Sequence, residues 1–398
     1  LDRLAAHASM TTSASAAEVS QRAQQWLTSH RYRFVVDDDG SLRAEAGRHR
    51  ETGNLVFHIF LVFVLVGVGW NTLWGFKGTS VVVEGQGFSN SITQYDEFKA
   101  GAMVDTDNLT PFSMKLRKFV VSFETGTVQR GAARSFDATV DLTMGGKTQT
   151  RDLQVNHPLR IGSTKVHLLG HGYAADVVVR DGDGKVAYSG PVVFLPQDAN
   201  FKSVGVIKVP DARPDRLAFQ GFFLPTGAIT AGGPTSLFPD ALNPQLYLTA
   251  WYGKPTVETG VPSNIYTLDT TGLTQVTNGK DKARFVLSPG QRYKLPDGKG
   301  SIQFNGWQRW AKIQVSQNPG LPLTFLSVVL SVAGLCVSLF SRSRRVWVRT
   351  IPGDDGLRVE IGGLDRSDSR SGAVDDVNSL LAALHGDSMS GDVGEEHS

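Results

Sequence analysis

Cysteine is almost missing from this sequence of 398 residues, since Cys336 is the single one. No intrachain disulfide can form, and no CxxC zinc site, iron–sulfur ligand set or C-x-x-C-H segment for covalent haem can be drawn. A strong charge of one sign is also lacking, because 40 basic residues oppose 38 acidic ones, for a formal net charge of +2. This balance argues against a dedicated nucleic-acid-binding protein, which would show a basic face.

Catalytic signatures are equally scarce. The sequence holds no G-x-S-x-G elbow, no phosphate-binding P-loop and no H-E-x-x-H pair. Residues 227–234 are Gly-rich but carry no Lys-Ser/Thr pair, and the acidic residues at 37–39, Asp181 and Asp183 are typical of hairpin turns. The sequence therefore predicts no catalytic residue and no metal site made of protein ligands alone.

Two long apolar runs without charged residues, 55–75 and 321–340, indicate transmembrane helices. About 20 residues with a rise of 1.5 Å each cross a hydrocarbon core of roughly 30 Å. We expect the membrane helices at residues 54–76 and 319–341.

Basic residues flank the two runs unevenly, which predicts their orientation. Three arginines precede the first run and one lysine closely follows it, namely Arg43, Arg48, Arg50 and Lys77. Two basic residues precede the second run and four follow it, namely Arg309, Lys312, Arg342, Arg344, Arg345 and Arg349. We therefore expect a multi-pass protein of the cell membrane, with residues 1–53 and 342–386 in the cytoplasm and 77–318 outside it. Residues 387–398, acidic and rich in Ser and Gly, are expected to form a disordered tail.

Residues 77–318 are rich in β-branched and aromatic residues, and several stretches alternate apolar with polar positions. Examples are VVVEG, KFVVSFET, SFDATVDLTM, QLYLTAWYG and SIQFNGWQRWAKIQVSQ. Tight hairpins with positive φ angles are expected at Gly145/Gly146, Asp181/Gly182 and Asp297/Gly298. The fold class that follows is a mainly β membrane protein. Two transmembrane helices flank a large extracytoplasmic β-rich region, which is either one sandwich-like domain or a pair of β lobes.

The two cytoplasmic segments are expected to contain short elements of their own. Residues 16–29 match an amphipathic helix, and residues 32–47 match a hairpin that turns at Asp39 and Gly40. Residues 357–363 predict a strand. One helical face is expected from Val374, Val377, Leu380, Leu381 and Leu384.

His58 lies near the start of the first apolar run, about one helical turn from its basic end. An ionisable residue inside a membrane span is costly and is by default a functional candidate. A neutral imidazole can bind a metal through one nitrogen while a partner orients the other, and haem iron is the natural metal here because zinc would need further protein ligands. The residues alone leave a second interpretation open, in which His58 meets interfacial water or caps a neighbouring helix.

Three further histidines, His157, His167 and His171, lie close together in the sequence and could bind a metal or the edge of a haem. Glycines flank His171, so a helical arrangement is disfavoured. Residues four apart on an extended strand lie too far apart to chelate one ion without a bend. We therefore interpret the three as polar residues at strand ends and in a proline turn.

The order of several motifs resembles the ResB family, also called CcsB. A span with GNLVFHIFLVFVLVG precedes the β-rich region, and NPG precedes a last span that ends in SRSRRVWVR. IGGLDR after that span and NHPL in the β-rich region extend the resemblance to nearly the whole chain. The resemblance implies a subunit of the system II cytochrome c maturation machinery. It would act with a multi-span ResC (CcsA) partner to deliver haem across the membrane and position it for attachment to apocytochrome c.

The resemblance also implies roles for single residues. His58 matches the intramembrane histidine of the family and would be an axial ligand of haem b, held transiently and shared with the partner chain, which would supply the second ligand. His157 lies in the matching NHPL segment and would contact haem or the apocytochrome. His167 and His171 receive no role.

Further partners and missing parts follow from the same resemblance. The apocytochrome thiols must be reduced, so a thioredoxin-like reductant is an expected partner. This chain has no redox thiol pair and no evident acid/base pair, so we expect it to be non-catalytic alone and to contribute positioning. The family has two further membrane helices before the first span, and the chain is expected to lack them.

A hypothesis of a different class remains open, namely a membrane-anchored extracytoplasmic β module that binds a partner protein without handling haem. His58 would then be structural. A signalling receptor is less favoured, because the cytoplasmic segments hold no kinase, nucleotide-binding or DNA-binding motif.

Overall fold

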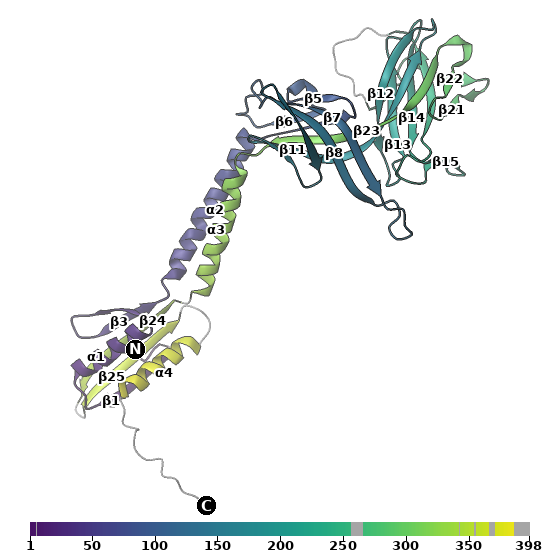
Figure 1. The fold of residues 1–398 in the computed structure, drawn as a ribbon. Coiled ribbons are helices and arrows are strands. Elements are labelled where there is room, and N and C mark those ends of the chain that lie inside the picture. The colour runs from purple at the N-terminus through teal and green to yellow at the C-terminus, as the bar shows by residue number, and fades with distance from the viewer. Residues whose placement is uncertain (5, 256–265, 342, 354–355, 366–370, 386–398) are drawn as a thin grey trace, which may run out of the picture. The chain divides into compact units, whose positions relative to one another are not determined.

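A computed structural model describes residues 1–398 except 5, 256–265, 342, 354–355, 366–370 and 386–398 (Figure 1). The described residues are mainly in β-strands, as predicted. The chain divides into two compact units: Leu1–Gly69 with Gly320–Ser398, called the terminal unit, and Trp70–Pro319, called the central unit. The tail expected at 387–398 lies outside the described residues.

The terminal unit contains an antiparallel sheet of order β1-β25-β24-β3-β2, built from both ends of the sequence. Its strands are β1 (Ala6–Thr12), β2 (Arg33–Val36), β3 (Leu42–Ala46), β24 (Arg344–Gly353) and β25 (Gly356–Asp365). The predicted hairpin is present as β2 and β3, with Gly40 at φ 80°, and the predicted strand lies within β25. The sequence pattern had left these segments separate, whereas β24 pairs with β3 and β25 pairs with β1.

Two helices, α1 (Ala16–Ser29) and α4 (Ser371–His385), pack with this sheet around one core. The helix predicted over residues 16–29 is confirmed, and a capping box between Ser15 and Glu18 begins it. Buried residues of both helices join those of the strands, among them Leu27, Leu380 and Ile361.

The two apolar runs form the helices α2 (His49–Trp74) and α3 (Leu321–Phe340). By length and composition, both helices are long and apolar enough to cross a membrane. Only 11% of the most apolar stretch of α2 and 17% of that of α3 are buried inside the protein, so neither is the core helix of a globular domain. Their apolar side chains need a surrounding of similar polarity.

Small residues let α2 and α3 approach closely within the terminal unit. A Cβ added at Gly334 would lie 2.9 Å from the carbonyl oxygen of Gly53, and Gly67 faces Thr324 in the same way. The hydroxyl of Ser331 donates a hydrogen bond to the carbonyl of Phe57 at 3.3 Å. Such small and hydroxyl-bearing residues are typical of helix contacts in membranes.

The central unit contains a long sheet with the main strand order β18-β17-β14-β13-β12-β11-β23-β4-β6. These strands are β4 (Phe76–Val83), β6 (Glu97–Ala100), β11 (Thr164–Arg180), β12 (Val186–Pro196), β13 (Ser203–Val209), β14 (Arg216–Leu224), β17 (Gln245–Gly253), β18 (Leu273–Gln275) and β23 (Ser301–Gln317). Three short strands pair beside this path, namely β10 (Leu159–Ile161), β21 (Arg284–Leu287) and β22 (Arg292–Lys294).

A second sheet of the central unit has the order β5-β7-β8-β9. Its strands are β5 (Gly87–Ser89), β7 (Ser113–Phe123), β8 (Ala133–Met144) and β9 (Lys147–Gln154). The remaining short elements are β15 (Gly227–Thr230), β16 (Gly233–Ser236), β19 (Thr277–Asn278), β20 (Asp281–Lys282), η1 (Ile92–Gln94) and η2 (Pro296–Gly298).

Two large hydrophobic cores lie in the described part of the central unit, and β11 and β23 contribute to both. One core joins Val166 and Ile313 of these strands to Phe119 of the second sheet. The other core contains Val177 and Phe304 from toward the opposite ends of the same two strands. The β-rich region is therefore a pair of lobes that share their longest strands.

The expected hairpin glycines are confirmed at two turns and corrected at a third. Left-handed φ angles occur at Gly145, Gly146, Asp297 and Gly298. Between β11 and β12, however, the φ of 81° belongs to Gly184 and not to Gly182. The N–H of Gly184 donates to the carbonyl of Asp181 at 3.0 Å, so the left-handed residue is the one that closes the turn and rejoins the strand.

Candidate functional site

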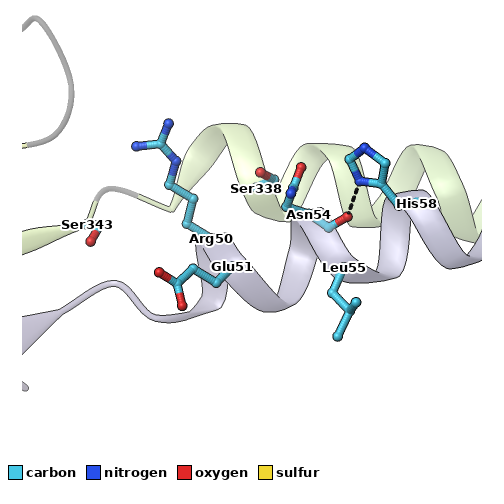
Figure 2. Close-up of a pocket in the computed structure, with 7 residues that line it drawn as sticks. All are labelled: Arg50, Glu51, Asn54, Leu55, His58, Ser338 and Ser343. Atoms are coloured by element: carbon cyan, nitrogen blue, oxygen red, sulfur yellow. Dashed lines mark hydrogen bonds between the residues drawn. The ribbon is translucent and has the colours of Figure 1, made fainter.

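His58 lies in the first half of α2, which is the half near Arg48 and Arg50. It lines an open pocket of about 850 Å³ in the terminal unit (Figure 2). The full lining is Arg50, Glu51, Asn54, Leu55, His58, Ser338 and Ser343. The pocket therefore combines an imidazole, a guanidinium, a carboxylate and small polar groups beside two apolar helices.

The hydrogen bond of His58 selects its tautomer. Nδ1 lies 2.8 Å from the backbone carbonyl oxygen of Asn54, one turn earlier in α2. A carbonyl oxygen can only accept, so Nδ1 carries a proton and donates it, and in the neutral imidazole Nε2 is then the nitrogen with the lone pair. The imidazole is exposed, and the ring of Phe57 lies edge-on to it with centroids 5.0 Å apart. Backbone geometry thus orients the ring and leaves Nε2 as the nitrogen that can bind a metal.

One such nitrogen suits an axial position on haem iron better than it suits a site in which the protein supplies every ligand of a metal ion. Within the described parts of the chain, no group of three or more His, Cys, Asp or Glu side chains could hold a metal. A haem macrocycle brings its own four equatorial nitrogens and needs only axial ligands from protein. The residues at His58 fit that requirement for one ligand.

His157 lies in the turn between β9 and β10 of the central unit. Its side chain is exposed, and Nδ1 lies 3.2 Å from the carbonyl oxygen of Val155. The preceding Asn156 has φ 65°, which lets the chain reverse here before Pro158. The turn interpretation of His157 is confirmed, and in the described part of the chain His157 belongs to no group of three or more His, Cys, Asp or Glu side chains that could hold a metal.

His171 lies in the middle of β11, so its interpretation as a strand-end residue was wrong, whereas His167 lies near the start of that strand. A register irregularity between Leu168 and Gly170 separates them. His167 is half-buried, and burial together with the charge of Lys165 lowers its pKa. β11 pairs with β23 along its whole length, from Thr164 to Arg180, and residues of both strands enter both cores of the central unit.

His171 is enclosed by aromatic rings. It is 8% exposed, and the rings of Phe119, Phe123, Phe136 and Phe201 lie within 6.3 Å of it between centroids. Its Nδ1 is buried and has no hydrogen-bond partner. Burial, with a smaller contribution from Arg309, lowers the pKa of His171 to about 4.

Arg309 is a feature that sequence reasoning missed. It was counted as a basic flank of the second apolar run, yet it is 6% exposed within β23. Its Nη2 donates to the carboxylate of Asp240 at 2.7 Å, and its guanidinium lies 5.0 Å from the ring centroid of Tyr173. The only sequence signal was its position in an alternating strand pattern, where a basic residue falls among aromatic ones.

The sequence is similar to proteins of one known family. A sequence model of the ResB-like family matches residues 1–374. The chain is 22% identical over 316 residues to "Cytochrome c biogenesis protein CcsB" of Synechococcus sp. (strain JA-3-3Ab), which is 79% of this chain and 55% of that protein. It is 20% identical over 331 residues to the CcsB of Microcystis aeruginosa (strain NIES-843 / IAM M-2473), which is 83% of this chain and 60% of that protein.

A shorter similarity, 28% identical over 136 residues, joins 34% of this chain to 27% of the CcsB of Picosynechococcus sp. (strain ATCC 27264 / PCC 7002 / PR-6). The chain thus spans a little over half the length of the first of these relatives. The match to the family model, by contrast, covers nearly all of the sequence. The chain therefore belongs to the ResB-like family.

Proposed function

We propose that this chain is a membrane subunit of a cytochrome c biogenesis complex and that it holds haem through His58, together with a CcsA-type partner. Membership of the ResB-like family and the names of its relatives support the role in biogenesis. The single observation that carries the haem role is the free Nε2 of an imidazole that the backbone of α2 has already oriented.

In this proposal α2 and α3 cross the cell membrane, with the arginine-bearing ends in the cytoplasm. The low burial of both helices supports the crossing, and the uneven distribution of basic residues supports the orientation. The central unit then lies outside the cytoplasm, where cytochromes of the c type receive their haem.

His58 supplies one axial ligand, and a histidine of the partner supplies the other. Haem is the cargo rather than a resident cofactor, so a ligand from each chain allows binding at their interface and later release. The carbonyl of Asn54 keeps Nδ1 protonated and the ring fixed, which reduces the entropy lost when Nε2 binds iron.

The central unit has a positioning role in this scheme. It either braces the outer face of the partner or receives the apocytochrome chain, with exposed His157 as a contact. Thioether formation adds two reduced cysteine thiols across the vinyl groups of haem, and those thiols belong to the apocytochrome, kept reduced by a thioredoxin-like protein. Holding haem and thiols together turns their encounter into a nearly unimolecular step.

The test is an absorption spectrum of the full-length protein purified with its CcsA-type partner. The wild type should show a haem Soret band, and His58→Ala should lose or shift it, with free imidazole restoring the signal. His49→Ala is the matched control, because His49 is an exposed histidine of the same helix outside the pocket lining.

Two results would contradict the haem role. An unchanged band in His58→Ala would place haem elsewhere. An intact complex with no haem in any preparation would favour the second hypothesis, a membrane-anchored module that binds a partner protein.

A further inference from the structure

Arg50 lines the same pocket as His58, near the start of α2. Arg344 and Arg345 of the same unit pair with Asp376 and Glu45. Arg50 differs, because its guanidinium makes no hydrogen bond or ion pair with any residue that the structure describes. Its five N–H donors are thus available to an anion inside the pocket.

Helical spacing places Arg50 beside the face that carries His58. Arg50, Asn54 and His58 follow one another at intervals of four residues, and such residues are neighbours along a helix surface. Figure 2 shows the heads of Arg50 and His58 on the same side of α2, whereas Leu55 and Glu51 extend to the other side. The Cα atoms of Arg50 and His58 are separated by about 12 Å along the helix axis, from a rise of 1.5 Å per residue.

We infer that Arg50 binds a propionate of the haem whose iron is bound by His58. This inference rests on the proposed function. When Nε2 of His58 binds the iron, the plane of the haem is perpendicular to the iron–Nε2 bond. The haem then lies alongside α2. Its propionate carboxylates stand at one edge of the ring, at a distance from iron that a flexible arginine side chain can meet from two helical turns away. A guanidinium matches a carboxylate in a planar, bidentate pair.

The ion pair between Arg50 and the propionate fixes the orientation of the haem. The propionate edge points to the arginine-bearing end of α2, where charged groups are solvated, and the vinyl edge points toward the apolar middle of the helix pair. Without Arg50 the iron–imidazole bond alone leaves the ring free to rotate about the bond axis. Arg50 is thus a positioning and specificity residue for a dicarboxylate porphyrin.

The experiment compares two ligands, ferric haem and haem dimethyl ester, whose propionates carry no charge. Both are titrated into the full-length protein with its partner, as wild type, Arg50→Gln and Arg48→Gln. Arg48 is the matched control, because it is an exposed arginine just before α2 and does not line the pocket. We expect Arg50→Gln to weaken haem binding about tenfold. It should leave the affinity for the ester and the Soret position unchanged, and Arg48→Gln should match the wild type.

Three outcomes would overturn the inference, and they separate it from the proposed function. An equal loss of both ligands in Arg50→Gln means that the substitution acts on the fold. An equal effect of Arg48→Gln means that a lipid phosphate or the general charge of the helix end is responsible. If His58→Ala loses haem but Arg50→Gln prefers haem over its dimethyl ester as strongly as the wild type does, the proposed function stands. Only the role of Arg50 is then removed.

Discussion

The imidazole of His171 stacks on the ring of Phe201, with centroids 4.6 Å apart and an interplanar angle of 23°. Phe136 approaches from the second sheet with centroids 5.2 Å away, so the histidine is enclosed where the two lobes of the central unit meet. No hydrogen bond satisfies its buried Nδ1. A neutral ring can stay there at little cost, whereas a protonated one would lose its hydration.

The first prediction is that His171 makes the protein acid-sensitive. Its folded pKa of about 4 lies below the ordinary value of 6.5, so the unfolded chain takes up the proton first as the pH falls. Stability is then full above pH 6.5 and decreases as the pH falls toward 4. At a pH of about 5 the loss should be about 2 kcal/mol.

Urea unfolding followed by tryptophan fluorescence checks this at neutral and mildly acidic pH. His171→Leu is the comparison, because it keeps an apolar side chain and removes the titrating group. Removing the unpartnered nitrogen should cost little at neutral pH. If the wild type and His171→Leu lose stability equally at acidic pH, His171 is not the cause of the acid sensitivity.

The second prediction concerns the buried Arg309 and its partner Asp240. Asp240→Asn leaves a buried guanidinium without its counter-charge and should destabilise the protein by about 2 kcal/mol. We expect a value below that of a fully buried pair, because 38% of the Asp240 side chain is exposed. Arg309→Met should cost less than Asp240→Asn, since it removes the buried charge itself.

Denaturation midpoints of the two variants measure this difference. Asp141→Asn is the control, because Arg117 of that ion pair is 59% exposed and such surface pairs contribute little. A cost for Asp141→Asn equal to that of Asp240→Asn would show that burial of Arg309 is not the cause.

The third prediction tests the contact between α2 and α3. Gly334→Ala places a methyl group 2.8 Å from the backbone nitrogen of Phe57, so the helices must separate. We expect a loss of about 1–3 kcal/mol, the usual cost of overpacking. Gly69→Ala on α2 meets no atom within 4 Å and should be neutral or slightly stabilising. Thermal denaturation of the detergent-solubilised protein compares them, and equal melting temperatures would mean that the helices do not pack through Gly334.

Local patterns predicted much of the fold. The helix at 16–29, the hairpin at Gly40 and the strands of QLYLTAWYG and SIQFNGWQRWAKIQVSQ all occur where their periodicity indicated. These features depend on neighbours within one element, so a single sequence carries the information. The prediction for Asp181/Gly182 was wrong because two glycines follow closely, and hydrogen bonding rather than composition decides which one turns left-handed.

Partners distant in the sequence were not predictable in the same way. The contact of Arg309 with Asp240 joins β23 to the segment before β17, and the ring contacts of His171 join β11 to the second sheet. No spacing rule connects such positions, because their proximity depends on how strands are ordered in the sheets. The role of Arg50 likewise depends on which arginines find partners, and that is a property of the folded surface.

By itself the sequence determined the mainly β class, the two apolar helices and the candidate histidine on one of them, because hydrophobic periodicity and the length of an apolar run are local quantities. Only the tertiary structure decided that both chain ends share one sheet, that β11 and β23 serve two cores, and that the backbone of Asn54 orients His58. These depend on strand order, burial and hydrogen-bond geometry, which arise when the whole chain packs.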